Sequence, residues 1–243
     1  MLTLDRTIEI VGSHTVTKNK TMRTKTTLVA AAILAAGLAS SMAQNVYSLN
    51  VVGYVNKVID GGGTYNLLCN PLKNANNNLT NLFSTAAGPQ QPSSQILTWD
   101  VVNFDFAVVQ PSFVAGSWSA NVDLSPGKGF FYVNNFSTFT NTFVGEVVQG
   151  SVTNLIVGSG SYNCIGSTAP IGGSFTNAIA GLVAGPSDQV FVWDKLTYDF
   201  NVIQPAFVAG VWTATVNVAI GEGLFYVNNG FVNKTWVRNF TVQ

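Results

Sequence analysis

Two pairs of aspartates are the residues whose type and spacing best suit acid–base chemistry. Asp100 and Asp105 lie five residues apart, and Asp194 and Asp199 repeat that spacing further along the chain. A glycoside hydrolase needs two carboxyl groups about 5 to 10 Å apart across a cleft, and a hairpin turn would bring each pair that close. Because Asp is a preferred turn residue, we favour the alternative that Asp100 and Asp194 only cap turns.

Trp118 and Trp212 offer a binding chemistry instead. Each follows a Phe-Val-Ala-Gly-x segment and is flanked by Ser, Thr and Asn. An exposed indole face beside small polar groups can hold a sugar ring by stacking and short hydrogen bonds. The alternative is that both rings belong to the core, as we expect of Trp99 and Trp193, and strand alternation does not decide between the two.

Cys69 and Cys164 are the two cysteines, and His14 is the one histidine. The cysteines follow matched tyrosines by an even number of residues, so each shares a strand face with its tyrosine. A disulfide between them suits an oxidising compartment, but we favour two buried thiols. Since His14 precedes the expected mature chain, no imidazole remains there to activate a nucleophile or ligate a metal.

The remaining motifs and the charge exclude further classes of chemistry. Gly127-Lys128-Gly129 and Gly221-Glu222-Gly223 lack the phosphate-loop pattern and precede a strand, so they are turns. No loop has the cluster of carboxylates typical of a calcium site, and we expect no metal and no cofactor. The chain is 9% charged with a formal net charge of zero, which excludes binding to nucleic acid through a basic surface.

The segments that must position these residues occur twice in the sequence. Residues 92–135 align without gaps on residues 186–229, with 24 identities in 44 positions. The match extends outward to Thr142-Phe143-Val144 and Thr235-Trp236-Val237. Each unit has the usual size of a small domain. We expect a first β-repeat over 44–148 and a second over 149–243, and a single β-domain with internal symmetry is the alternative.

Both units carry the local pattern of short strands. Runs rich in Val, Phe, Tyr, Trp and Thr alternate with Gly, Pro, Asn and Asp. In the first unit they predict strands at 48–58, 64–69, 95–99, 103–109, 117–122, 129–134 and 140–148, with equivalents in the second. A helical turn is expected at 78–84, with its counterpart at 175–182. The fold class is therefore all-β, as two tandem β-sandwich-like repeats.

The N-terminal region predicts export. Met22, Arg23 and Lys25 are followed by an uncharged apolar run from Leu28 to Leu38 and by Ser41-Met42-Ala43, a small-x-small cleavage site. We therefore expect residues 22–43 to be a signal peptide and residues 1–21 to be a mis-assigned start, with a real N-terminal extension as the weaker alternative. The apolar run is about half the length that a membrane span requires. We expect no transmembrane segment after cleavage and a periplasmic, cell-surface or extracellular protein.

The order VGYVN, YNLLCNPL, a WD hairpin, PGKGFFYVNN and FVGEV resembles a group of uncharacterised exported bacterial proteins with related repeats. The resemblance covers nearly all of residues 46–243. The second unit departs from it at Gly166-Ser167 and at Ile220, where the first unit has Asn70-Pro71 and Pro126. The resemblance implies export and β-structure, and it assigns no activity.

Together these features predict an exported, non-enzymatic structural or adhesive surface protein. Its low charge and abundant amides and hydroxyls suit neutral polysaccharide or self-association as partners. A carbohydrate-binding protein with Trp118 and Trp212 as platforms is the alternative. A glycoside hydrolase is the weaker alternative.

Overall fold

The computed structural model describes residues 51–84, 90, 92–174 and 181–241 of this chain. The described residues belong to one compact unit, Asn50–Gln243. The predicted start, signal peptide and cleavage site all lie outside them. Within the described part, no helix has both the length and the apolar character to cross a membrane.

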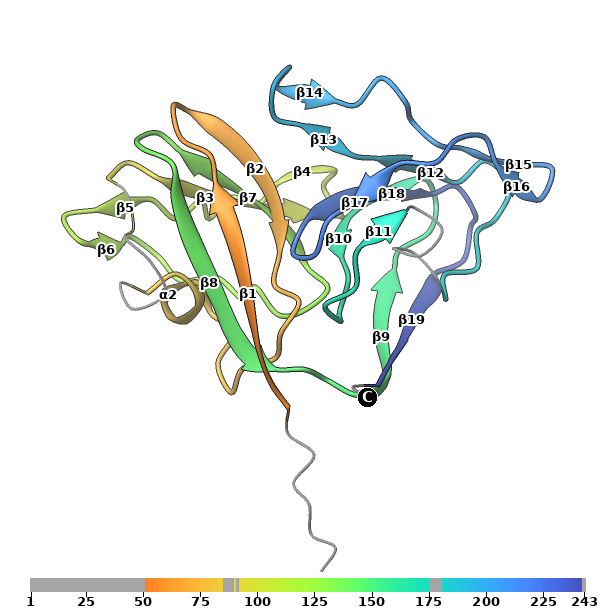
Figure 1. Ribbon diagram of the computed structural model, residues 1–243. Coiled ribbons are helices and arrows are strands. Elements are labelled where there is room, and N and C mark those ends of the chain that lie inside the picture. Colours follow the sequence, from red (N-terminus) through yellow and green to blue (C-terminus); the bar gives the residue numbers. More distant parts are fainter. Residues whose placement is uncertain (1–50, 85–89, 91, 175–180, 242–243) are drawn as a thin grey trace, which may run out of the picture. The chain divides into compact units, whose positions relative to one another are not determined.

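The first half of the unit is built from antiparallel strands (Figure 1). In chain order its elements are β1 (Val52–Ile59), β2 (Thr64–Cys69), α2 (Leu79–Leu82), β3 (Gln95–Asp100), β4 (Asp105–Phe106), β5 (Phe113–Val114), β6 (Ser117–Trp118), β7 (Gly129–Asn134) and β8 (Phe139–Glu146). A sheet of order β2-β7-β3-β4 forms one layer, and the ribbon β1-β8 pairs separately.

The second half has the corresponding elements. They are β9 (Gly150–Ile156), β10 (Ser161–Gly166), β11 (Gly173–Ser174), β12 (Gln189–Phe191), β13 (Trp193–Asp194), β14 (Asp199–Phe200), β15 (Phe207–Val208), β16 (Val211–Trp212), β17 (Asn217–Val218), β18 (Gly223–Asn228) and β19 (Lys234–Phe240). The sheet β10-β18-β12 and the ribbon β19-β9 are its main layers. The predicted all-β class is confirmed.

The pairing registers of the two halves correspond. Thr64 pairs with Asn134, and Ser161 with Asn228, so β2 maps on β10 at an offset of 97 and β7 on β18 at 94. Thr140 and Thr235 pair with the equivalent residues Val58 and Leu155. The structure therefore aligns Thr235 with Thr140 instead of Thr142, because one additional residue separates β18 from β19.

Each half has a core between its ribbon and its sheet. In the first half the buried residues are Ile59, Leu68, Leu72, Leu79, Leu82, Phe83, Ile96, Leu124, Phe130, Tyr132, Phe139, Phe143 and Val147. In the second half they are Ile156, Ile165, Val190, Val192, Val218, Leu224, Tyr226 and Trp236. Alternation along β7 and β18 directs every second residue to these cores.

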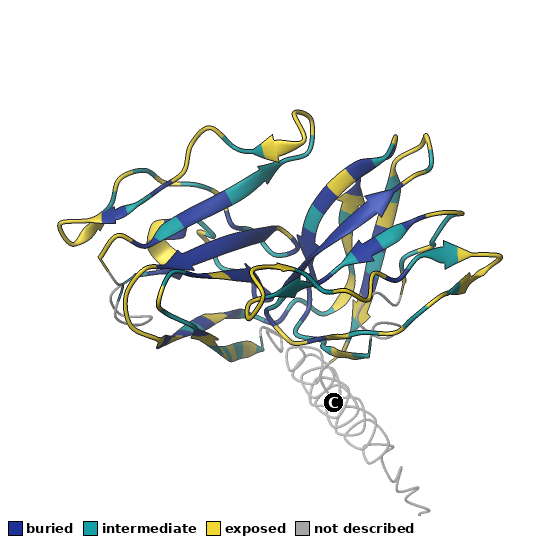
Figure 2. Cartoon of the chain, turned by 90° about the horizontal axis from the view of Figure 1, so that it is seen from above, coloured by how far each residue is buried: buried dark blue, intermediate teal, exposed yellow. Residues whose placement is uncertain are grey.

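A third cluster buries the other face of both sheets. It consists of Leu67, Leu97, Phe131, Val133 and Phe225, and Trp99, Phe106, Cys164, Phe191, Trp193 and Phe200 pack against it. Because both faces are covered, all six residues of β7 and of β18 are buried (Figure 2). Apolar runs without alternation, such as Phe130-Phe131, follow from this two-sided burial.

Backbone contacts join the two halves beside this third cluster. Cys69 N donates to Gly221 O at 3.0 Å, and at the equivalent place Gly166 N donates to Gly127 O at 3.1 Å. A Cβ atom on Gly166 would lie 2.2 Å from the sulfur of Cys69. The second half thus has glycine where the first has Cys69, and not where it has Asn70 as the sequence comparison suggested, because a side chain at residue 166 would collide with that of Cys69.

The predicted strands differ in length from those observed. β2, β3 and β7 agree with their expected ranges to within one residue, whereas the strands expected at 103–109 and 117–122 are only the dipeptides β4 and β6. The helical turn at 78–84 is present as α2. Residues 175–180 of its expected counterpart lie outside the described residues.

Candidate functional site

Asp100 and Asp105 are brought together as cross-strand partners at the start and end of a turn. The Asp100 carboxylate accepts hydrogen bonds from Val102 N at 2.9 Å, Asn103 N at 3.2 Å and Asn103 Nδ2 at 2.7 Å. Asp105 Oδ1 accepts from Phe106 N at 2.7 Å. Both carboxylates therefore hold their own surface turn, which is the geometry of a turn cap.

Asp194 and Asp199 have the same placement. They are cross-strand partners, Asp194 Oδ1 accepts from Leu196 N at 2.9 Å, and Asp199 Oδ1 accepts from Phe200 N at 2.7 Å. Among the described residues, no group of three or more His, Cys, Asp or Glu could hold a metal ion. Asp194 and Asp199 therefore hold their own turn, as the first pair does.

The Asn103 contacts lower the pKa of Asp100 below its usual 3.8. The stabilising effect of this carboxylate is therefore present above the unfolded-chain pKa of about 3.9 and is lost as pH falls through the lower folded value. We expect Asn103→Ala to raise the Asp100 pKa toward 3.8 in an NMR titration, because it removes the largest cause. An unchanged pKa in this variant would contradict that assignment.

Trp118 and Trp212 are half-buried on the cores of their own halves. Trp118 Nε1 donates to Phe83 O at 3.3 Å, and the ring meets Phe113 and Tyr132 at centroid distances of 5.3 and 6.0 Å. Trp212 makes the equivalent ring contacts with Phe207 and Tyr226. Edge-to-face packing of this kind is typical of core aromatics, so the geometry does not favour either ring as a sugar platform.

Cys69 and Cys164 are free thiols, and Cys164 packs against the third cluster. Burial raises the pKa of Cys69 to about 12 and raises that of Cys164 as well. Both groups are therefore protonated at neutral pH, and neither is an activated nucleophile.

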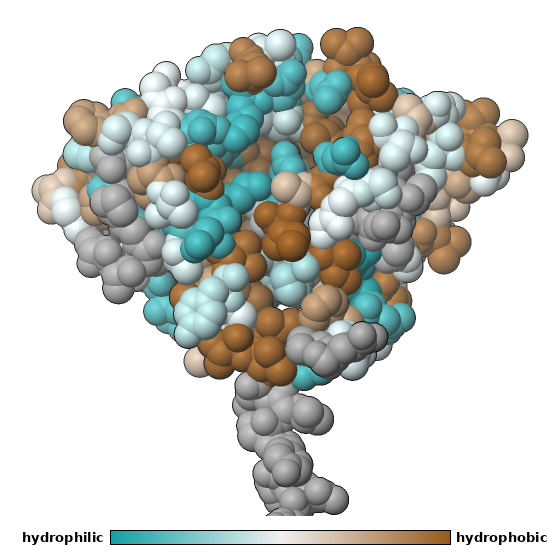
Figure 3. All heavy atoms as spheres, in the orientation of Figure 1, coloured by the Kyte–Doolittle hydropathy of each residue, from teal (hydrophilic) through white to brown (hydrophobic). Residues whose placement is uncertain are grey.

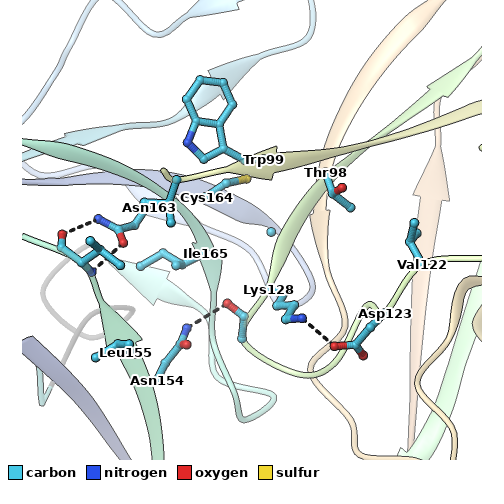
Figure 4. A pocket seen from close by; sticks show the side chains of 14 residues that line it. Thr98, Trp99, Val122, Asp123, Lys128, Asn154, Leu155, Asn163, Cys164 and Ile165 are labelled. Carbon is cyan, nitrogen blue, oxygen red and sulfur yellow. Dashed lines mark hydrogen bonds and ion pairs between the residues drawn. The ribbon is translucent and has the colours of Figure 1, made fainter. Parts of the chain in front are cut away.

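A pocket of about 430 Å³ lies where the two halves meet, which we call the junction pocket (Figure 4). It is lined by Thr98, Trp99, Val101, Val122, Asp123, Gly127, Lys128, Gly129, Asn154, Leu155, Val157, Asn163, Cys164 and Ile165. Its volume is within the range of about 300–1,000 Å³ usual for small-molecule sites. Apolar side chains alternate here with amides, and the ion pair Lys128–Asp123 (2.5 Å) is solvent-exposed.

One hydrogen-bond donor in this lining is unpartnered. Trp99 Nε1 is buried and has no hydrogen-bond partner among the described residues. The ring packs edge-to-face with Phe106 and Phe225, at centroid distances of 5.5 and 5.2 Å. An unpaired buried donor costs about 1–3 kcal/mol, and this atom is almost inaccessible to solvent.

The equivalent place on the other side of the junction is nearly filled. That pocket measures about 30 Å³ and is lined by Lys57, Val58, Asn66, Leu67, Leu68, Trp193, Lys195 and Glu222. Here Trp193 Nε1 donates to Tyr65 O at 2.7 Å. Lys195 of the second half also forms an ion pair with Asp60 of the first.

Several lining residues differ between the two sides, and two of the differences exchange a charged residue for valine. By the offsets given above, Lys195 corresponds to Val101 and Asp60 to Val157, and both valines line the junction pocket. Valine side chains form no ion pair, so the contact of Lys195 with Asp60 between the halves has no counterpart at Val101 and Val157. The junction pocket lies on the side of the junction that lacks this ion pair.

Sequence reasoning assigned Trp99 to the core and missed this site. The informative signal was a difference between the copies, at residues 101 and 195 and at residues 60 and 157, where charge on one side replaces apolar character on the other. That signal becomes interpretable only when the two positions are known to face each other.

Comparison with protein-family models, curated proteins and solved structures found no match to this chain.

Proposed function

We propose that this chain is an exported, non-enzymatic structural or adhesive protein that associates with copies of itself through apolar loops. The observation that carries the proposal is the exposure of large apolar side chains at equivalent positions in both halves. Val108 and Val202 are 99% and 95% exposed, and Val102 and Leu196 are 78% and 90% exposed.

We call these two surfaces the loop surfaces, each made of the turn after β3 or β13 and the segment after β4 or β14. Phe104 and Tyr198 extend them, as do Val109 and Ile203, all about half-exposed. Figure 3 shows hydrophobic residues gathered along the edge around β14 and the β15–β16 hairpin. Large exposed apolar patches usually mark interaction sites, whereas single exposed apolar residues are common on any protein surface.

Two matching surfaces make one chain bivalent. A molecule that presents the same self-complementary surface twice can bind one copy at each, so assembly does not stop at a dimer. Low charge favours such contacts because little electrostatic repulsion opposes them. This gives the structural or adhesive role a physical basis in the loop surfaces.

Sedimentation velocity over a range of concentrations tests the proposal. We expect the protein to form species larger than dimers. The variant Val102→Ser with Val108→Ser should stop at dimers, and so should Leu196→Ser with Val202→Ser. All four substitutions together should leave monomers.

The matched control is Val183→Ser with Val232→Ser, which changes residues 79% and 73% exposed outside the loop surfaces. It should assemble like the unmodified protein. A protein that stays monomeric at every concentration, or a control that assembles as poorly as the fourfold variant, would refute this role for the loops.

A further inference from the structure

We infer that Phe104 and Tyr198 are the anchoring residues of self-association, and that each ring packs on a loop surface of a second copy. This inference rests on the proposed function and names the two side chains that supply its main contacts. The observation that carries it is the backbone conformation of these two residues.

Phe104 and Tyr198 adopt a backbone conformation that is unfavourable for bulky residues. Their φ angles are 55° and 56°, in the left-handed region where the Cβ atom comes too close to a backbone carbonyl oxygen. The other non-glycine residues with a positive φ in the described part of the chain are all small: Ser93, Ala115, Ser159, Ser187 and Ala209. Glycine would adopt this conformation without strain, yet an aromatic residue occupies the position in both halves.

The turns do not need these rings to form. The Asp100 carboxylate accepts from Val102 N and Asn103 N, and Asp100 pairs with Asp105 across the two strands that the turn joins. Asp194 holds the second turn in the same way. The aspartates and the strand pairing therefore impose the backbone conformation that strains the aromatic residue.

A contact within the chain does not account for both rings either. Each side chain is 51% exposed. The Tyr198 hydroxyl lies 3.5 Å from Thr64 Oγ1, at the outer limit of a hydrogen bond. Phe104 has no hydroxyl, so this contact cannot be the reason for an aromatic residue in both turns.

A strained and exposed residue that the fold does not require is typical of a functional contact. Aromatic residues are enriched in the buried centre of protein interfaces, where they supply a large area with few rotatable bonds. A second copy is the partner that fits, because it presents the same ring in the same turn and aromatic side chains pack favourably on each other. The neighbouring Val102 and Leu196 would then exclude water around the rings.

Sedimentation velocity and urea unfolding of the same variants test the inference. Phe104→Gly and Tyr198→Gly should each stop at dimers, and the double glycine variant should be monomeric. Phe104→Ala and Tyr198→Ala should lose assembly equally. Their unfolding equilibrium constants should be about two- to fivefold larger than those of the glycine variants, because alanine keeps the Cβ atom that is strained at a positive φ.

Two further variants serve as controls. Phe104→Tyr with Tyr198→Phe exchanges the rings between the turns and should assemble like the unmodified protein. Phe136→Ala removes a ring that is 61% exposed, lies outside the loop surfaces and has no positive φ. It should also leave assembly unchanged.

A double glycine variant that assembles like the unmodified protein would overturn the inference and leave self-association through other residues standing. Glycine variants that are less stable than the alanine variants would show that the rings are not held under strain. Loss of assembly in Phe136→Ala would show that exposed rings act without regard to position. An unmodified protein that stays monomeric would refute the proposed function, and this inference with it.

Discussion

Replacing Lys234 with methionine will destabilise the protein by about 3–5 kcal/mol. Asp188 is fully buried, and its Oδ2 accepts from Lys234 Nζ, from the Tyr226 hydroxyl at 2.5 Å and from Gly185 N at 2.7 Å. Methionine retains the apolar stem of lysine and removes its charge. The Asp188 carboxylate then stays buried without a cation, and urea unfolding will show the loss as a lower midpoint.

The first half supplies a matched control for this experiment. Ser94 and Phe139 occupy the positions equivalent to Asp188 and Lys234, so that half has no ion pair there. Asp188→Ser with Lys234→Phe should therefore lose less stability than Lys234→Met alone, because no charge is left buried. A double variant less stable than Lys234→Met would show that the cost comes from packing instead of charge.

Phe225→Ala will lower the free energy of unfolding by about 3–5 kcal/mol and will affect both halves together. Phe225 is only 3% exposed, and its ring meets those of Trp99, Phe200 and Phe131 at 5.2, 5.5 and 6.3 Å. Truncation leaves a cavity in the third cluster, to which both sheets contribute. Differential scanning calorimetry should show one transition at a lower temperature.

Phe131→Ala removes the equivalent ring from the first half and should cost about as much. Phe136→Ala, at a residue 61% exposed, should change the free energy of unfolding by less than about 0.5 kcal/mol. Two separate transitions, with only the second-half transition shifted by Phe225→Ala, would mean that the halves unfold independently.

Several features could be predicted from residues that lie close together in the sequence. Asp100 and Asp194 were interpreted as turn caps because Asp accepts hydrogen bonds from backbone N–H groups two residues ahead, and both do so. The Phe-Tyr-Val runs became β7 and β18, since aromatic and β-branched residues favour strands. Such features depend on neighbours within a few residues along the chain.

The candidate site could not be predicted from neighbouring residues in the sequence. Trp99 and Trp193 stand in the same Trp-Asp motif, and only one has an acceptor for its N–H. Around these tryptophans, Val101 and Val157 line one side of the junction, whereas their equivalents Lys195 and Asp60 form an ion pair on the other, and each pair joins residues far apart in sequence. Strand alternation states which residues share a face but does not state what covers that face.

By itself, the amino-acid sequence determined the all-β class and the turns, because these follow from the conformational preferences of adjacent residues, and the duplicated segment, because it is read from residue identity. Only the tertiary structure decided that Phe131 and Phe225 share one cluster, that Trp118 and Trp212 pack inward, and that one side of the junction stays open. Those outcomes depend on which apolar face of one sheet packs against which apolar face of another. Burial stabilises any close apolar contact. The shape and charge of side chains far apart in the sequence therefore decide which apolar faces pack together.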